Sequence, residues 1–384
     1  MSIRSNYFKM NKKDFESYLS DLKRSDNTIK ILGDRYFFNQ SPECMELILK
    51  LRDKLHDFDV LMNSFTSFSR KQIIQSFLID EIVSTNKIEN INSTKHDIFS
   101  VINNAASSSD KKIISIANAY KRMTLSKGEK ITSCKKLREL YDEILKDGLD
   151  KNDLPDGLYF RKGNVYITDG LKTDHIGLSG EENINRAMDE FLKLYNSKNE
   201  VFLKMLLCHF IFENVHPFYD GNGRFGRFLL SNGLYLETNS LFSFAISSSF
   251  EKEKSKYYKA FKLADDQYEF GCLNSYFETM MEILIEQIGK MIDEFTDKKT
   301  KMPLNDSSIM TKSEKKVYEL IKEATLFSDF GISNKEIIAE SGVSKRTLMY
   351  VLKTMDGKSL LIDTKIGKLT YHKFASESKI KEKM

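Results

Sequence analysis

Long stretches of the chain place apolar residues three and four positions apart, which is the spacing of one face of an α-helix. Proline, which interrupts helices, occurs only four times in 384 residues. The spacing predicts helices over residues 45–58, 71–88, 111–123, 135–146 and 183–195. Residues 201–215 and 228–236 are more uniformly apolar and predict two buried helices. We therefore expect a mainly α-helical protein.

Two segments depart from this pattern. Residues 157–167 carry aromatic and β-branched side chains on both sides of Lys162-Gly163-Asn164, which predicts a short β-hairpin that turns at these three residues. The first 30 residues are polar and charged, and we expect them to fray or to dock loosely.

The region after residue 288 has a different composition. Residues 293–303 predict a connector, and residues 313–321 predict an amphipathic helix. Residues 333–352 then read as helix, turn, helix, with Ser333 and Ser344 as caps and Gly342 in the turn. Residues 360–371 predict a two-stranded wing.

Composition narrows the class of protein. The chain is 41% hydrophobic and 30% charged, as in soluble globular proteins. No apolar run reaches about 18 residues and the start lacks a secretion signal, so we expect a cytoplasmic protein without a membrane span. The four cysteines are far apart and form no zinc pattern, and Cys208 is expected to be buried. A net charge of +4 is too weak to indicate nucleic acid by itself.

The loop between the two buried helices, residues 216–227, is unusually polar. It reads His-Pro-Phe-Tyr-Asp-Gly-Asn-Gly-Arg-Phe-Gly-Arg. Glycines let the backbone approach an anion, and the amides that open the next helix point outward at its positive end. Guanidinium groups match phosphate oxygens, a carboxylate can hold Mg²⁺, and an imidazole can take a proton near neutral pH. The loop predicts phosphate chemistry.

This loop resembles the signature of the Fic domain, H-x-F-x-[D/E]-G-N-[G/K]-R-x-x-R, with every fixed position filled. Most members of that family transfer AMP from ATP to a hydroxyl side chain of a protein. The resemblance implies that His216 is the general base and that Asp220 holds Mg²⁺. It also implies that Arg224 contacts the triphosphate and Arg227 its terminal phosphate. The implied nucleotide-binding set is Phe218, Gly221, Asn222, Gly223, Arg224 and Arg227.

A second segment, residues 84–90, resembles the inhibitory helix motif of many Fic proteins, [S/T]-x-x-x-E-[G/N]. Thr85, Glu89 and Asn90 fill its fixed positions. In the family this glutamate pairs with the second arginine of the loop, so the resemblance implies that Glu89 bonds Arg227. The carboxylate would then occupy the fork that the terminal phosphate needs and leave ATP badly oriented.

Two further segments fit the same family. In Fic domains a hairpin at the place of residues 157–167, the flap, pairs with the target backbone like an added strand. Many relatives have a Pro-Pro pair after the flap, and residues 175–180 lack it, so the target preference stays open. In relatives a tyrosine near Tyr257 and Tyr258 lines the adenine pocket. The sequence decides neither which of the two does so nor whether they belong to the core.

The C-terminal segment resembles a winged helix-turn-helix domain. Lys345, Arg346 and Thr347 open its candidate recognition helix, where base-reading side chains would lie. Lysines that could meet phosphates are Lys353, Lys358, Lys365 and Lys368. Winged helices also bind proteins and dimerise, and DNA and protein both stay open as partners.

Taken together, the sequence predicts a Fic-type helical bundle with a small β-hairpin flap, followed by a winged helix-turn-helix domain. The expected divisions are residues 1–110, an N-terminal helical region with the inhibitory helix; 111–292, the Fic core; and 305–375, the winged helix. The function implied is an auto-inhibited protein adenylyltransferase that uses ATP and Mg²⁺. Its partner would be a protein with a Tyr, Ser or Thr hydroxyl, including the chain itself, and a homo-oligomer stays open. Alternatives are a nucleotide-sensing DNA-binding regulator, or a Fic enzyme that transfers or removes another phosphate-containing group.

Overall fold

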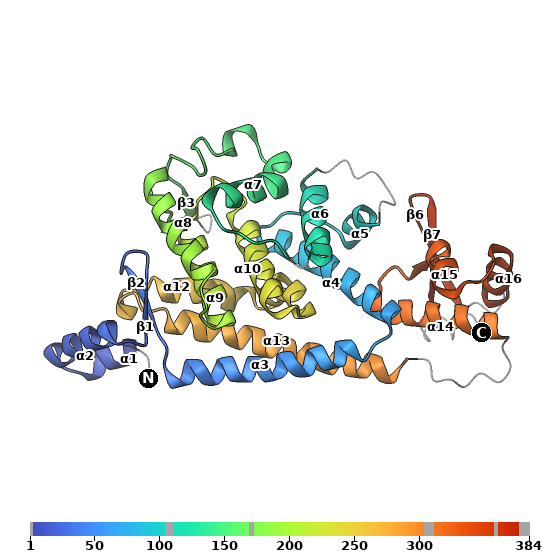
Figure 1. Cartoon of the computed structure of the whole chain (residues 1–384), viewed down its shortest axis with the longest axis horizontal. Helices are drawn as coiled ribbons and strands as arrows, with labels where there is room; N and C mark the ends of the chain where they lie inside the picture. Colours follow the sequence, from blue (N-terminus) through green and yellow to red (C-terminus); the bar gives the residue numbers. More distant parts are fainter. Residues whose placement is uncertain are drawn as a thin grey trace.

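The structure is a computed structural model that describes residues 3–103, 111–126, 128–168, 173–302, 311–356 and 360–375. These residues form a mainly helical fold with small sheets, which confirms the fold class predicted from the apolar spacing (Figure 1). None of the described helices is both long enough and apolar enough to cross a membrane. The side chains that build the central core come from the following helices: α3 (Pro42–Asn63), α4 (Ser67–Ile88), α5 (Lys95–Ile102), α6 (Lys111–Ser126), α7 (Cys134–Leu145), α8 (Glu181–Tyr195), α9 (Val201–Val215), α10 (Asn222–Thr238), α11 (Ile246–Lys252), α12 (Lys254–Ala264) and α13 (Asn274–Thr300).

The centre of the fold is the helix pair α9 and α10, which the polar loop joins. Thirteen of the residues of α9 are buried, which explains why its sequence is apolar all round. Glu200 caps its start by accepting a hydrogen bond from the Leu203 amide at 2.9 Å. The helix α10 begins at Asn222, earlier than the apolar residues alone predict, because Gly221 can adopt the left-handed conformation at its N-cap (φ 77°). The two helices hold the loop between buried surfaces.

Below this pair in Figure 1, α3 and α13 lie side by side along the length of the molecule. Ser41 caps α3 and Pro42 opens it. The helix α4 then runs diagonally from the C-terminal end of the molecule up to α10 (Figure 1). It is buried on most sides, including the polar residues Glu81, Thr85 and Asn86.

The N-terminal residues, for which we expected fraying or loose docking, form regular elements, and few of their side chains are buried. They form α1 (Ile3–Lys9), α2 (Lys12–Arg24) and a hairpin of β1 (Thr28–Ile31) with β2 (Tyr36–Asn39). Ile3 and Phe15 pack with Phe37 and Cys272 in a small core of their own. The apolar residues of this segment are few, but they meet a distant part of the chain, which local composition does not reveal.

The predicted hairpin exists at a shifted position. Its strands are β3 (Tyr166–Thr168) and β4 (Thr173–Ile176), which pair antiparallel. Lys162-Gly163-Asn164 is therefore not the turn of the hairpin, and residues 157–165 form a loop without strand pairing. The reason is Arg161, whose buried guanidinium holds this loop against the helix ends.

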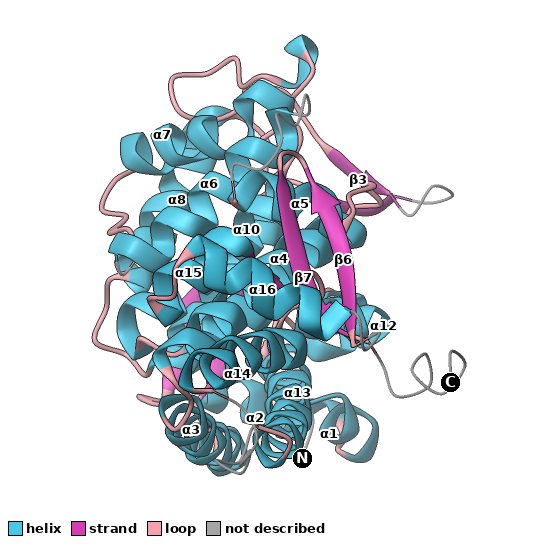
Figure 2. Ribbon diagram, turned by 90° about the vertical axis from the view of Figure 1, so that its right-hand side faces the viewer, coloured by secondary structure: helices cyan, strands magenta, loops and turns pink. Residues whose placement is uncertain are grey.

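The C-terminal unit, residues 311–375 without 357–359, lies at one end of the molecule (Figure 1) and faces the viewer in Figure 2. It consists of α14 (Lys312–Phe327), β5 (Ile332–Ser333), α15 (Asn334–Ser341), α16 (Lys345–Asp356), β6 (Leu361–Ile366) and β7 (Leu369–Phe374). The sheet has the order β5-β7-β6. Ser333 forms a capping box with Glu336, and Gly342 ends α15 at φ 71°. Lys358 lies outside the described residues.

The predicted connector is helical over most of its length, which corrects that expectation. The helix α13 continues to Thr300, whereas Pro303 lies outside the described residues. Phe295 is buried and its ring stacks on Phe327 of α14 with centroids 6.1 Å apart. Lys298 lies over the Phe295 ring at 5.0 Å. These aromatic contacts with the C-terminal unit favour the helix over a linker, although the local sequence is polar.

Candidate active site

The polar loop is held in one shape by its backbone and by a buried amide. His216 ends α9 in the left-handed conformation, with φ 53°. The Asn222 side chain is buried and bridges the loop, because its Oδ1 accepts from the Phe218 amide at 2.9 Å and its Nδ2 donates to the Phe218 carbonyl at 2.8 Å. Asn222 thus braces the loop, and the residue left to face a ligand is the exposed Asp220.

Aromatic packing fixes the underside of the loop. Phe218 is fully buried and its ring stacks on Tyr141 of α7 at 3.5 Å between centroids. The Tyr141 hydroxyl donates to the Asp220 carbonyl at 2.8 Å. Phe218 therefore anchors the loop to the core and does not reach outward, which explains why the motif needs an aromatic residue there.

Arg161 is a structural residue of the site that the sequence analysis did not identify. It is fully buried and its guanidinium donates to four carbonyl groups. Its Nε donates to His216 at 2.8 Å, and its Nη2 to Leu178 at 2.8 Å and Val215 at 3.2 Å. The remaining bond goes to Gly163. One side chain therefore joins the histidine, the loop before β3 and the segment after β4. The local sequence did not mark Arg161 as buried, because it stands next to Lys162.

The arginines of the loop differ in what they bind. Arg224 is buried, and its Nη2 donates to Asp220 Oδ2 at 3.3 Å. Its Nε has no hydrogen-bond partner. A buried guanidinium donor without a partner is costly and is a natural place for an anion.

The end of α4 accepts three hydrogen bonds from Arg227. Its Nε donates to Thr85 Oγ1 at 3.0 Å, while its Nη2 donates both to the Thr85 carbonyl at 3.1 Å and to Glu89 Oε1 at 2.8 Å. The amide of Glu89 bonds to Asn86, so the Thr85 carbonyl is one of those that the helix end leaves for an outside donor. Asn90 follows with φ 57° and closes the helix. The contact between Glu89 and Arg227 that the motif resemblance implied is present.

Glu89 also reaches the start of α10. A Cβ added at Gly223 would collide with Glu89 Oε1 and would lie 3.0 Å from Arg227 Nη1. The carboxylate therefore lies at the amide end of α10, where the partial positive charge of the helix favours an anion. Although burial disfavours its charge, the guanidinium of Arg227 holds the pKa of Glu89 below its ordinary value.

Tyr257 and Tyr258 have different surroundings. Tyr257 is buried, its hydroxyl lies 3.0 Å from His209 Nε2, and it is within hydrogen-bonding reach of Arg227. Tyr258 is 41% exposed, and its hydroxyl donates to the Ile88 carbonyl at the end of α4. Tyr257 thus belongs to the core behind Arg227, whereas Tyr258 covers the end of α4 next to Glu89.

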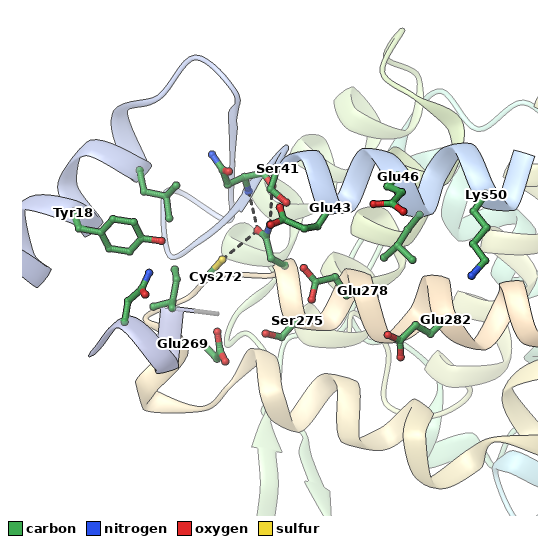
Figure 3. Close-up of a pocket in the computed structure, with 16 residues that line it drawn as sticks. Tyr18, Ser41, Glu43, Glu46, Lys50, Glu269, Cys272, Ser275, Glu278 and Glu282 are labelled. Atoms are coloured by element: carbon green, nitrogen blue, oxygen red, sulfur yellow. Dashed lines mark hydrogen bonds between the residues drawn. The ribbon is translucent and has the colours of Figure 1, made fainter. Parts of the chain in front are cut away.

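A large cavity, about 550 Å³ in volume, lies elsewhere, where α1 and α2 meet the starts of α3 and α13 (Figure 3). Five carboxylates line it together with Lys50: Glu43, Glu46, Glu269, Glu278 and Glu282. None of the residues that line it belongs to the polar loop. Its negative charge disfavours a nucleotide, so the cavity does not compete with the loop as a phosphate site.

The comparisons with known proteins agree with this geometry. Residues 131–234, which include the polar loop, match the family model described as Fic/DOC family. A Fic family protein from Desulfovibrio desulfuricans has a similar fold, with a TM-score of 0.57 and 18% identity over 88% of this chain and 97% of that chain. A segment of Fic-1 from C. elegans matches at 14% identity over 66% of this chain and 73% of that one, with a TM-score of 0.48. The protein thus contains a Fic/DOC family domain across residues 131–234.

Proposed function

We propose that the protein is an adenylyltransferase that moves AMP from ATP to a hydroxyl of a protein and is restrained by its own Glu89. The observation that carries the proposal is the hold of α4 on Arg227, whose Nη2 donates to Glu89 Oε1 at 2.8 Å and to the Thr85 carbonyl at 3.1 Å, while its Nε donates to Thr85 Oγ1 at 3.0 Å. Because the N–H donors of this guanidinium already bond to α4, they are not free to bind the terminal phosphate of ATP.

The residues around Glu89 fit a nucleotide. Gly223 leaves space at the amide end of α10, and the unpartnered Nε of Arg224 supplies a buried donor. Mg²⁺ would be held by Asp220 and by phosphate oxygens, and it would neutralise charge on the triphosphate. Among the described residues, no group of three or more His, Cys, Asp or Glu side chains is placed to hold a metal ion.

In the reaction, an acceptor hydroxyl attacks the α-phosphorus, and the bond from that phosphorus to the bridging oxygen breaks to release pyrophosphate. His216 takes the hydroxyl proton. The left-handed backbone of His216 and the hydrogen bond from Arg161 to its carbonyl orient the imidazole at the end of α9. The strands β3 and β4, next to Arg161, are proposed to receive the target as an added strand. Arginine side chains and the amides of α10 stabilise the charge on the phosphate oxygens.

The decisive experiment compares the wild type with Glu89→Gly after incubation with ATP and Mg²⁺, by intact mass. Removing the carboxylate frees one bond of Arg227 Nη2 and clears the space beside Gly223. ATP can then approach the reactive pose, which we expect to raise self-modification about a hundredfold. The added mass identifies the transferred group as AMP, UMP or phosphate. Adding His216→Ala to Glu89→Gly should abolish the signal. A wild type as active as Glu89→Gly would disprove the restraint, and a signal that survives His216→Ala would disprove the assigned base.

We further propose that the C-terminal unit is a winged helix-turn-helix. The support is the order α14, β5, α15, α16, β6, β7 and the left-handed turn at Gly342. Met349 and Tyr350 are exposed on α16, at 53% and 67%.

A further inference from the structure

One face of α4 carries three polar residues at intervals of one helical turn, Glu81, Thr85 and Glu89. The facing side of α10 carries Gly223, Arg227 and Ser231 at the same interval. Glu81 Oε1 accepts from Ser231 Oγ at 3.3 Å, Thr85 bonds Arg227, and Glu89 bonds Arg227 beside Gly223. The two helices therefore meet along a continuous polar seam that ends at the candidate phosphate site.

Glu81 is the buried end of this seam. Its side chain is fully buried, and none of the described residues pairs a cation with it. Its two oxygens accept from the Ser247 amide at 2.9 and 2.8 Å, and one of them from the Ser248 amide at 3.3 Å. The Tyr120 hydroxyl of α6 lies 3.4 Å away. Burial raises the pKa of Glu81, and these hydrogen bonds from neutral donors on α6, α10 and α11 oppose that shift. The buried carboxyl is satisfied only while these helices are all in place.

Releasing Arg227 requires movement of the backbone of α4. A rotation of the Glu89 side chain would free one bond of Nη2, but the bond from Nη2 to the Thr85 carbonyl belongs to the main chain. For a phosphate to take the whole fork, the last turn of α4 has to withdraw. Glu81 lies two turns before Glu89 on the same face, so a helix held at Glu81 resists that withdrawal.

From this arrangement we propose that Glu81 is a positioning residue, which fixes α4 in the register that places Glu89 and Thr85 on Arg227. This inference rests on the proposed function, because it concerns the restraint of the same site. It predicts that weakening the hold on Glu81 releases the enzyme without any change in the residues that contact Arg227.

The test uses the full chain and the rate of self-modification measured by intact mass with ATP and Mg²⁺. Glu81→Gln keeps the shape but replaces one acceptor oxygen by a donor that faces the amides of Ser247 and Ser248. We expect it to raise the rate about tenfold, which corresponds to the loss of about one buried hydrogen bond. Ser231→Ala leaves the carboxyl of Glu81 in place, removes one donor, and should raise the rate less.

The double variant Glu81→Gln/Glu89→Gly distinguishes positioning from a general loosening of the fold. If Glu81 acts through the hold on Arg227, Glu81→Gln raises the rate less in the Glu89→Gly background than in the wild type, because only the Thr85 bonds remain to be released. Tyr276→Phe is the matched control, since it removes a buried hydroxyl bond to the Leu206 carbonyl, between α13 and α9, away from the seam. It should leave the rate of the wild type unchanged.

The outcomes separate the inference from the proposed function. A gain in Glu89→Gly with none in Glu81→Gln and Ser231→Ala overturns the inference alone. A double variant about tenfold faster than Glu89→Gly, or a gain in Tyr276→Phe, also overturns it. No gain in Glu89→Gly defeats the restraint itself, and the inference with it. Faster amide exchange over residues 82–89 in Glu81→Gln, with the rate gain, supports it.

Discussion

The site depends on Arg227, because this side chain interacts with the ends of two helices at once. Its cation satisfies a carbonyl at the negative end of α4, and the Glu89 carboxylate that it holds lies at the positive end of α10. Burial by itself would lower the pKa of Arg227, and the neighbouring Glu89 raises it above its ordinary value. The site is therefore an ion pair between two complementary helix ends.

Behind Arg227, a second carboxylate behaves in the opposite way. Burial raises the pKa of Glu213 to about 8, although Arg227 lies close enough to oppose the shift. Burial also lowers the pKa of its neighbour His209 to about 3, and the two side chains approach within 3.9 Å. At neutral pH we therefore expect a protonated glutamate next to a neutral histidine.

This pair predicts a specific pH dependence of stability. The pKa of Glu213 in the folded protein lies above its ordinary value of 4.5. The stability that the protonated side chain contributes is therefore fully present below about pH 4.5 and is lost as the pH rises toward 8. Each pH unit in that window should remove up to about 1.4 kcal/mol from the free energy of unfolding. Glu213→Gln should flatten this part of the profile, measured by denaturant unfolding at pH 5, 6, 7 and 8. A variant whose profile matches the wild type would rule out the buried proton.

At the scale of elements, the spacing of apolar residues predicted helices well where apolar side chains cover the buried surface of the helix. The bounds of α9 agree with the apolar run 201–215, and α7 and α8 begin within two residues of their predicted starts. The contact of Glu89 with Arg227 was predicted through a motif, since no local pattern joins residues so far apart in the sequence. Local sequence failed at the hairpin, because the turn residues Lys162-Gly163-Asn164 are held by the guanidinium of Arg161 and by the Tyr219 hydroxyl, which accepts from the Gly163 amide at 2.9 Å.

Arg161 should accordingly be needed for the placement of His216. Arg161→Lys keeps the charge but cannot donate to four carbonyls in one plane. In the Glu89→Gly background we expect the rate of modification to fall by about a hundredfold while ATP binding, measured by calorimetry, stays within about twofold. Arg138→Lys is the control, since Arg138 also donates to a nearby carbonyl, that of Tyr159 at 3.1 Å, but does not touch His216. Equal losses in both variants would assign the effect to the loop as a whole.

At the scale of the whole molecule, α4 connects the C-terminal unit to the candidate active site (Figures 1 and 2). Phe68, in its first turn, packs in the core of the C-terminal unit with Val317 and Ile321. Glu323 of α14 accepts from Thr66 Oγ1 and Ser69 Oγ, both at 2.6 Å. These contacts, like the docking of Ile3 and Phe15, join residues far apart in sequence, and for that reason composition alone did not predict them.

The contacts of Glu323 at the start of α4 allow a test of how far a local loss of structure spreads along this helix. Glu323→Ala leaves two hydroxyl groups without their charged partner and should destabilise the start of α4 and α14 by about 2–3 kcal/mol. We expect amide exchange to accelerate over residues 67–75 and 317–327, whereas residues 82–89 stay protected, because Glu81 holds the middle of the helix to α6, α10 and α11. Glu319→Ala, one turn earlier on α14, is the control and should change neither segment. If exchange accelerates evenly through residue 88, α4 opens as one cooperative unit, and the C-terminal unit controls the hold of Glu89 directly.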